Sequence, residues 1–162
     1  MNYALRPTIC CLLLACLTPL THSAEGTTVA KPWARATAEG QQVGAIFCSI
    51  SNPGTTADKL LRVESATATT VEVHEHITTK DGLMKMQAVA NGIDIPTKGT
   101  VTLKPGGYHV MLIGLANRLT KGSTVKATFV FEKAGSIAVE ATVLEAGAMS
   151  ADEGTIDKKP AK

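Results

Sequence analysis

The stretch that decides the fold is residues 74–111, HEHITTKDGLMKMQAVANGIDIPTKGTVTLKPGGYHVM, because strand-forming residues alternate there with closely spaced turn signals. Asp81-Gly82 and Asn91-Gly92 are dipeptides preferred in type I′ hairpin turns, where both central residues have positive φ. Pro105-Gly106-Gly107 marks a third turn. The stretch therefore predicts short strands joined by tight turns.

The same pattern continues outward at the roughly 8 to 12 residue spacing typical of β-sandwiches and barrels. Further turn signals stand at Asn52-Pro53-Gly54 and Lys121-Gly122, and no long segment has a helical period. The chain is therefore predicted to be all-β. Strands are expected near residues 43–51, 59–65, 70–78, 83–89, 100–103, 108–115, 124–132 and 137–144.

The two ends of the chain differ from this pattern. Residues 1–24 are expected to be a secretory signal peptide, with Arg6 before an apolar run that is far shorter than the roughly 20 residues needed to span a bilayer. Leu13-Leu14-Ala15-Cys16 resembles a lipobox, so lipid anchoring at Cys16 is the minority alternative. Residues 25–146 form the expected single domain, and residues 147–162 are predicted to be a disordered tail.

Charge and cysteine content narrow the classes of function. Without residues 1–24 the chain has 15 Lys and Arg against 14 Asp and Glu, and the lysines are scattered, so no nucleic-acid partner is expected. Cys48 is then the single cysteine, which excludes an internal disulfide. It lies on the apolar segment Ala45-Ile46-Phe47-Cys48, where a small buried hydrophobe is the favoured interpretation.

Soft metal-ligating side chains are concentrated in residues 74–111. Three of the four histidines and three of the four methionines after the initiator lie there as three pairs: His74 with His76, Met84 with Met86, and His109 with Met111. Imidazole and thioether groups together suit Cu(I) better than the cations that prefer oxygen. Each pair has i, i+2 spacing, so on a strand its two members share one face.

The neighbouring aliphatic residues indicate which face that is. Val71 and Val73 alternate with the histidines, and Val110 alternates with His109 and Met111, so the aliphatic set is the expected core face and the donors point outward, at the rim. A single methionine is ordinarily core filler and a single histidine ordinarily a solvated residue. The set favoured as metal ligands is His74, Met86, His109 and Met111, while His76 and Met84 remain additional candidates.

Six segments resemble the PCuAC family of periplasmic copper chaperones, and the match runs over about residues 29–143. They are PWARAT (32–37), SNPG (51–54), VEVHE (71–75), GLMKM (82–86), IP (95–96) and, most specifically, LKPGGYHVML (103–112). The resemblance implies a cupredoxin-like Greek-key β-sandwich or barrel. It also implies Cu(I) binding by His74, Met86, His109 and Met111. The 22 residues between Met86 and His109 are one more than in the usual family pattern.

The resemblance further implies a monomeric, non-enzymatic carrier in the periplasm that delivers copper to the CuA subunit of a terminal oxidase or to a Sco-type assembly factor. Whether Cu(II) also binds, through His74 and His76, stays open. Two alternatives remain: a copper redox protein, which would need the Cys48 thiolate, and a metal-free secreted binding module with Trp33 and Arg35 as interface anchors.

Overall fold

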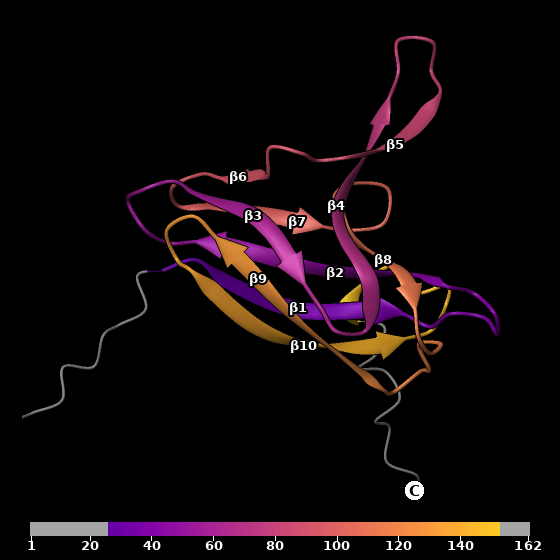
Figure 1. The fold of residues 1–162 in the computed structure, drawn as a ribbon. Helices are drawn as coiled ribbons and strands as arrows, with labels where there is room; N and C mark the ends of the chain where they lie inside the picture. Colours follow the sequence, from indigo (N-terminus) through magenta and orange to yellow (C-terminus); the bar gives the residue numbers. More distant parts are fainter. Residues whose placement is uncertain (1–25, 153–162) are drawn as a thin grey trace, which may run out of the picture.

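The computed structural model describes residues 26–152, which form ten β-strands and contain no α-helix (Figure 1). The predicted signal peptide with Cys16, and residues 153–162 of the predicted tail, lie outside the described residues. The strands are β1 (Thr28–Arg35), β2 (Val43–Asn52), β3 (Asp58–Glu64), β4 (Ala68–Thr78), β5 (Met84–Ala88), β6 (Ile93–Ile95), β7 (Gly99–Leu103), β8 (His109–Leu115), β9 (Thr124–Phe131) and β10 (Ser136–Leu144).

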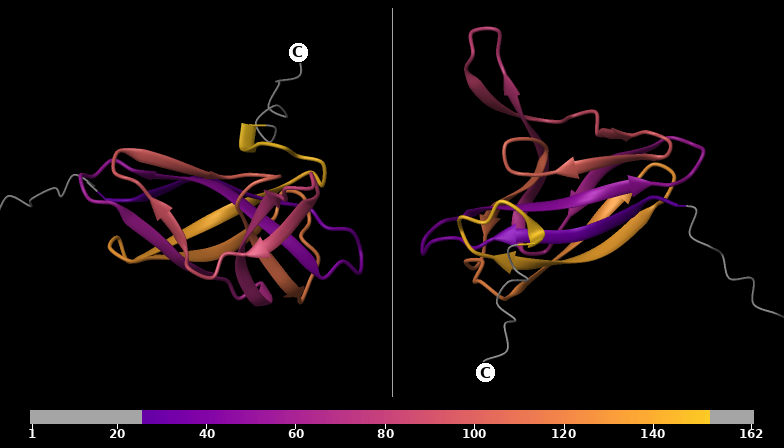
Figure 2. Two further views of the ribbon diagram at one scale, coloured as in Figure 1. Left: turned by 90° about the horizontal axis from the view of Figure 1, so that it is seen from above. Right: turned by 180° about the vertical axis from the view of Figure 1, so that it is seen from behind.

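All ten strands belong to one curved, open sheet (Figure 2). Nine of them follow the order β5-β4-β8-β2-β1-β10-β9-β3-β6, and β7 pairs with β2 beside this path. One edge of β2 is shared by β8, which pairs with residues 43–46, and by β7, which pairs with residues 48–52. The pair β1–β10 is parallel, and the other pairs are antiparallel. The sheet folds back on itself, so that β3 and β4 approach each other across the core. The all-β prediction is confirmed.

All eight predicted strands are present, and two further strands were not predicted. In β1, Lys31 has φ 49° and precedes Pro32, and the pairing with β2 shifts register between Ala30 and Trp33. This bulge interrupts the two-residue alternation by which a strand is recognised in a sequence. The other strand, β6, has three residues and pairs only with β3 among the described strands.

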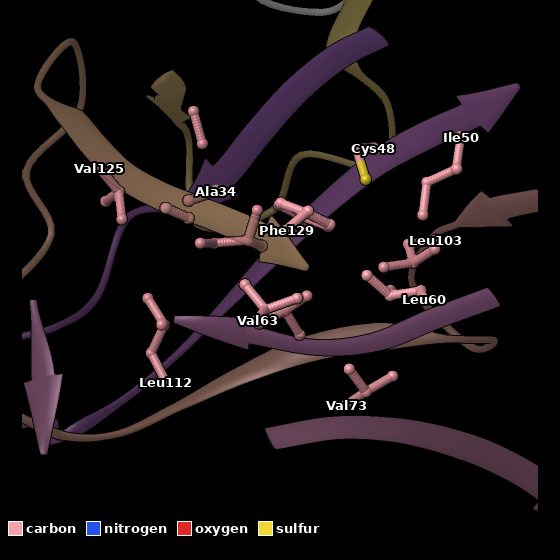
Figure 3. Packing of buried hydrophobic residues seen from close by; sticks show 14 of the residues in the cluster. Ala34, Cys48, Ile50, Leu60, Val63, Val73, Leu103, Leu112, Val125 and Phe129 are labelled. Carbon is pink, nitrogen blue, oxygen red and sulfur yellow. The ribbon is translucent and has the colours of Figure 1, made fainter. Parts of the chain in front are cut away.

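The main hydrophobic core lies between the two halves of the folded sheet, where Leu60, Val63, Val73 and Phe129 gather (Figure 3). Cys48 is 2% exposed and belongs to this core, as predicted. A second, smaller cluster lies on the opposite face of β2 and consists of Trp33, Phe47, Leu144 and Ala148.

The segment that follows β10 packs on this second cluster. Ala148 is buried, and its carbonyl oxygen accepts a hydrogen bond of 2.8 Å from Nε of Arg35. The guanidinium of Arg35 also lies 5.6 Å from the centre of the Phe47 ring. Residues 147–152, the first part of the predicted disordered tail, are therefore packed against the domain, because Ala148 covers aromatic surface that strand alternation alone does not reveal.

The prediction of type I′ turns is wrong at both dipeptides. Lys31 and Lys98 are the non-glycine residues with positive φ in the described part of the chain, so Asp81 and Asn91 lack the required conformation. Thr79 and Leu83 close a three-residue loop in which Gly82 has φ 77°, the usual geometry of a type I turn followed by a left-handed glycine. Asn91-Gly92 joins β5 to β6, which pair with different strands, and so forms no hairpin.

Gly92→Ala is expected to destabilise the fold by about 3 kcal/mol or more, through backbone strain and collision together. Gly92 has φ 72°, and a Cβ atom there would lie 2.4 Å from the carbonyl oxygen of Leu60. The matched control is Gly82→Ala, because Gly82 has φ 77° and an added Cβ atom would meet nothing within 4 Å. This variant should lower the free energy of unfolding by only about 1 to 2 kcal/mol. Urea unfolding of both variants measures the difference, and equal losses would contradict the predicted collision.

Candidate metal centre

The six candidate donors lie on one face of β4, β5 and β8, opposite the main core. Val73 of β4 and Val110 of β8 are buried in that core, and side chains alternate across a strand, so His74 and His109 point to the other face. The predicted orientation of the donors is thus confirmed. The hairpin of β4 and β5 extends away from the body of the domain and carries Met84 and Met86 with it (Figure 1).

The strand register determines which donors are neighbours. His74 pairs with His109 across β4 and β8, and Met86 pairs with His76 across β4 and β5. Met111 lies next to the His74–His109 pair and faces Glu72. Side chains opposite each other on one face of an antiparallel pair have Cβ atoms about 4.5 to 5.5 Å apart. Met86 therefore stands directly beside His76 and only diagonally from His74.

The donors become steadily more exposed toward the hairpin tip. His109 is 4% exposed, Met86 is 43% exposed, and Met84, which pairs with Thr78, is 66% exposed. The expectation that all donors lie at an open rim therefore holds for the methionines of β5 and is wrong for His109. The rings of His74, His76 and Phe47 surround His109 and shield it from solvent, with the Phe47 centroid 6.4 Å away.

Three imidazole rings form the centre of this face. The centroids of His76 and His109 are 4.9 Å apart with the rings inclined by 27°, and those of His74 and His109 are 5.9 Å apart. Nδ1 of His109 lies 3.0 Å from the carbonyl oxygen of Gly107, to which it donates as the N–H tautomer. That tautomer leaves the lone pair of His109 on Nε2.

Glu72 fixes the ring of His74 and was not identified from the sequence. Nε2 of His74 lies 2.7 Å from Oε2 of Glu72, so it carries the proton and leaves the lone pair on Nδ1. The Nδ1 atoms of His74 and His76 are buried and have no hydrogen-bond partner in the structure. Because buried polar atoms are normally satisfied, two unpartnered imidazole nitrogens on one face of β4 fit the binding of a cation. The i, i+2 spacing of Glu72 and His74 was the signal available in the sequence.

The pKa of His109 is lowered from its ordinary value, first by burial and further by the nearby rings of His76 and His74, although the Gly107 hydrogen bond acts in the opposite direction. A lowered pKa favours the neutral imidazole, which is the form that binds metal. At neutral pH His109 is therefore ready to act as a ligand without first losing a proton.

Nitrogen and carboxylate groups alone do not complete a metal site. Among residues 26–152, no three His, Cys, Asp or Glu side chains are already arranged to hold a metal ion. A centre here needs the thioether sulfurs of Met86 and Met111, or a rotation of the imidazole rings. Two thioethers with two imidazoles are a donor set that suits Cu(I), so the predicted residues fit this ion.

Cys48 is separated from these donors by the thickness of the sheet. It lies on the core face of β2, and burial raises its pKa to about 12. The thiol therefore stays protonated at neutral pH, whereas copper binding by cysteine requires the thiolate. Cys48 is a packing residue.

Glu72→Gln is expected to weaken Cu(I) binding about tenfold, because the loss of the carboxylate removes the charge-assisted hydrogen bond that orients the His74 ring. The measurement is a competition titration against a chromophoric Cu(I) chelator under anaerobic conditions. Glu140→Gln is the control, since Glu140 is on β10, away from the donors, and pairs with Lys126 of β9. Equal affinities of the two variants would contradict a positioning role for Glu72.

The fold and the donor set together define an all-β domain with a His/Met cluster at one edge of its sheet. The family described as "Putative lipoprotein LpqE-like" matches residues 27–143, and the chain belongs to this family. "Putative lipoprotein Lxx21020" of Leifsonia xyli subsp. xyli is 34% identical over 108 residues. That match covers 67% of this chain, and the chain spans 63% of the length of this relative.

Solved PCuAC domains are similar in structure. The copper-bound PCuAC domain from PmoF2 has a TM-score of 0.61 and 29% identity, with 74% of this chain and 92% of that chain covered. The Cu(I) form of DR1885 from Deinococcus radiodurans has a TM-score of 0.53 and 32% identity, with 74% and 75% covered. The predicted PCuAC resemblance and the cupredoxin-like fold class are confirmed, although the sheet is open and not a closed barrel.

Proposed function

We propose that this protein is a copper chaperone that binds Cu(I) through His74, Met86, His109 and Met111. The observation that carries the proposal is the cluster of imidazoles and thioethers on one face of β4, β5 and β8, which contains two buried imidazole nitrogens without partners. Copper-bound structures among its PCuAC neighbours support the choice of ion.

The chemistry of the donors favours Cu(I) in an oxidising compartment. Thioethers and imidazoles hold this soft ion without a thiol that would oxidise or exchange disulfides. Thioethers also carry no proton near neutral pH, so only the imidazoles make the affinity fall in acid. The site therefore suits an exported carrier better than a thiolate site would.

The position of the donors supports transfer to another protein. The β4–β5 hairpin projects from the rest of the domain (Figure 2). Met84 and Met86 on β5 are exposed, while His109 at the other end of the cluster is buried. An acceptor that approaches the hairpin replaces the outer ligands first, and the inner ligands release copper afterwards. This stepwise exchange needs no opening of the core.

The proposed setting is the periplasm, where a monomeric, non-enzymatic carrier passes copper to the CuA subunit of a terminal oxidase or to a Sco-type assembly factor. The lipoprotein description of the family and of the relative from Leifsonia xyli supports export. No helix within residues 26–152 is long and apolar enough to cross a membrane.

The experiment is an anaerobic titration of the purified protein with Cu(I), followed by mixing with a copper-free CuA domain. One Cu(I) per chain is the expected stoichiometry, and the CuA absorption bands should appear once the mixture is oxidised by one electron per CuA centre with a mild chemical oxidant. An absence of Cu(I) binding would contradict the proposal and favour a metal-free binding module. An intense thiolate-to-copper band near 600 nm in the oxidised protein would instead favour a redox protein that uses Cys48.

A further inference from the structure

We propose that His76 is a further copper ligand, which together with His74 and His109 allows this site to take Cu(II) as well as Cu(I). The inference rests on the proposed function and deepens it, because it concerns the same face of the sheet. His76 is outside the four-residue set that the PCuAC resemblance implies.

Strand pairing places His76 inside the donor cluster. It pairs with Met86 on β5, and its ring stacks on that of His109 at 4.9 Å. The backbone N–H of His76 donates to the carbonyl oxygen of Gly107 at 3.3 Å, and the same oxygen accepts from Nδ1 of His109. This shared acceptor holds the two rings side by side.

The spacing of the rings fits a shared ion. An imidazole nitrogen binds such metals at about 2.0 to 2.1 Å, and the centre of the ring lies about 1.1 Å beyond the nitrogen. If the two metal–nitrogen bonds of one ion enclose an angle of 90° to 180°, the centroids of the two rings are therefore roughly 4.5 to 6.4 Å apart. The distances from His109 to His76 and to His74, 4.9 Å and 5.9 Å, both lie in this range.

The unsatisfied nitrogens indicate the ligand atoms. Nδ1 of His74 and Nδ1 of His76 are buried without partners, and Nε2 is the free nitrogen of His109 in the tautomer that Gly107 selects. The three side chains do not yet form a complete metal group, so His76 must rotate about its side-chain bonds to bring Nδ1 to the ion. The strand itself need not move, because the ring is already in contact with that of His109.

Three imidazoles change which oxidation state the site accepts. Cu(II) is a harder ion that binds imidazole nitrogens well in tetragonal geometry, whereas thioethers favour Cu(I). The carboxylate of Glu72, hydrogen-bonded to His74, adds a negative charge beside the ion. The same face thus offers a nitrogen-rich set for Cu(II) and a sulfur-containing set for Cu(I).

The test compares the wild-type protein with His76→Gln and His76→Ala, and uses Thr78→Ala as the control. Thr78 is the next residue on the same face of β4, opposite Met84. Each protein is titrated with Cu(II) alone, and bound Cu(II) is examined by electron paramagnetic resonance for nitrogen couplings. Quenching of Trp33, the single tryptophan, gives a second readout, since its ring is 4.5 Å from Phe47 and Phe47 is 6.4 Å from His109.

The wild-type protein and Thr78→Ala are each expected to bind one Cu(II) per chain through three imidazole nitrogens. Both His76 variants are expected to bind Cu(II) at least tenfold more weakly and through two imidazole nitrogens. Cu(I) affinity should change less than threefold in the same variants. Unchanged Cu(II) affinity and nitrogen count in folded His76 variants would overturn the inference. Wild-type protein that binds Cu(I) but not Cu(II) would also overturn it and leave the proposed function standing, whereas binding of neither ion would overturn both.

Discussion

His109→Ala is expected to weaken Cu(I) binding at least 100-fold, equivalent to about 2.7 kcal/mol of binding free energy. His109 is the most enclosed of the donors, and its ring is held by Gly107, His76 and His74 in an orientation that leaves Nε2 free. Its loss removes a preorganised neutral imidazole that no neighbouring side chain replaces without rotating. A competition titration with a Cu(I) chelator measures the change.

The matched variant is Met111→Leu, which conserves side-chain volume and removes only the sulfur. Met111 is partly buried two residues beyond His109 on the same face of β8, so the variant should fold normally and also lose at least tenfold in Cu(I) affinity. Met149→Leu controls for a methionine outside the cluster. Wild-type Cu(I) affinity in both His109→Ala and Met111→Leu, with intact unfolding transitions, would refute the assignment of the site.

Asp58→Ala is expected to lower the free energy of unfolding by about 3 kcal/mol, because hydrogen bonds to a buried charged group are among the stronger ones. Asp58 is 5% exposed and is the first residue of β3. It accepts hydrogen bonds from the Thr27 hydroxyl and from the backbone N–H groups of Lys59, Lys133 and Ala134. One side chain therefore joins the start of β1, the start of β3 and the β9–β10 turn.

This contribution should depend on pH with a defined sign. Burial alone would raise the pKa of Asp58, but its hydrogen bonds lower the pKa below the ordinary value of 3.8. A lowered folded-state pKa means that the stabilisation is complete well above pH 3.8 and is lost as the pH falls toward the folded-state pKa. The difference in unfolding free energy between wild type and Asp58→Ala should therefore narrow below about pH 4.

Denaturant unfolding at pH 7 and at pH 3 measures this narrowing. Asp94→Ala is the control, since Asp94 is exposed and its carboxylate forms a surface ion pair with Lys59. If the difference in unfolding free energy between wild type and Asp58→Ala is the same at both pH values, the ionised carboxylate of Asp58 is not the source of the stabilisation.

The all-β fold was predictable because alternation and turn residues are local signals. The same locality explains the errors. The bulge at Lys31-Pro32 interrupts the alternation by which β1 would be recognised in the sequence. The type I′ turns were predicted from dipeptides alone, although the backbone conformation of a dipeptide also depends on the strand with which the following segment pairs. At Gly92 that partner is the backbone of Leu60, far away in the chain, and no local rule indicates it.

The faces of the donors were predictable, and their mutual arrangement was not. Side chains alternate between the two faces of a strand, so His74 and His109 were predicted to point away from the core residues Val73 and Val110, and the structure shows this arrangement. In a hairpin the loop length sets the register, and the predicted two-residue turn at Asp81-Gly82 differs by one residue from the three-residue loop observed, so the sequence did not reveal that Met86 stands beside His76. The burial of His109 follows from rings contributed by β2 and β4, which alternation within β8 cannot show.

X-ray absorption spectroscopy at the copper edge of the Cu(I)-loaded protein tests the central claim most directly, because it counts sulfur and nitrogen ligands without a mutation. The proposed set of His74, Met86, His109 and Met111 predicts one Cu(I) per chain with two sulfur and two nitrogen scatterers, and loss of one sulfur scatterer in Met111→Leu. A site with nitrogen and oxygen scatterers alone would contradict a chaperone that holds Cu(I) through methionine.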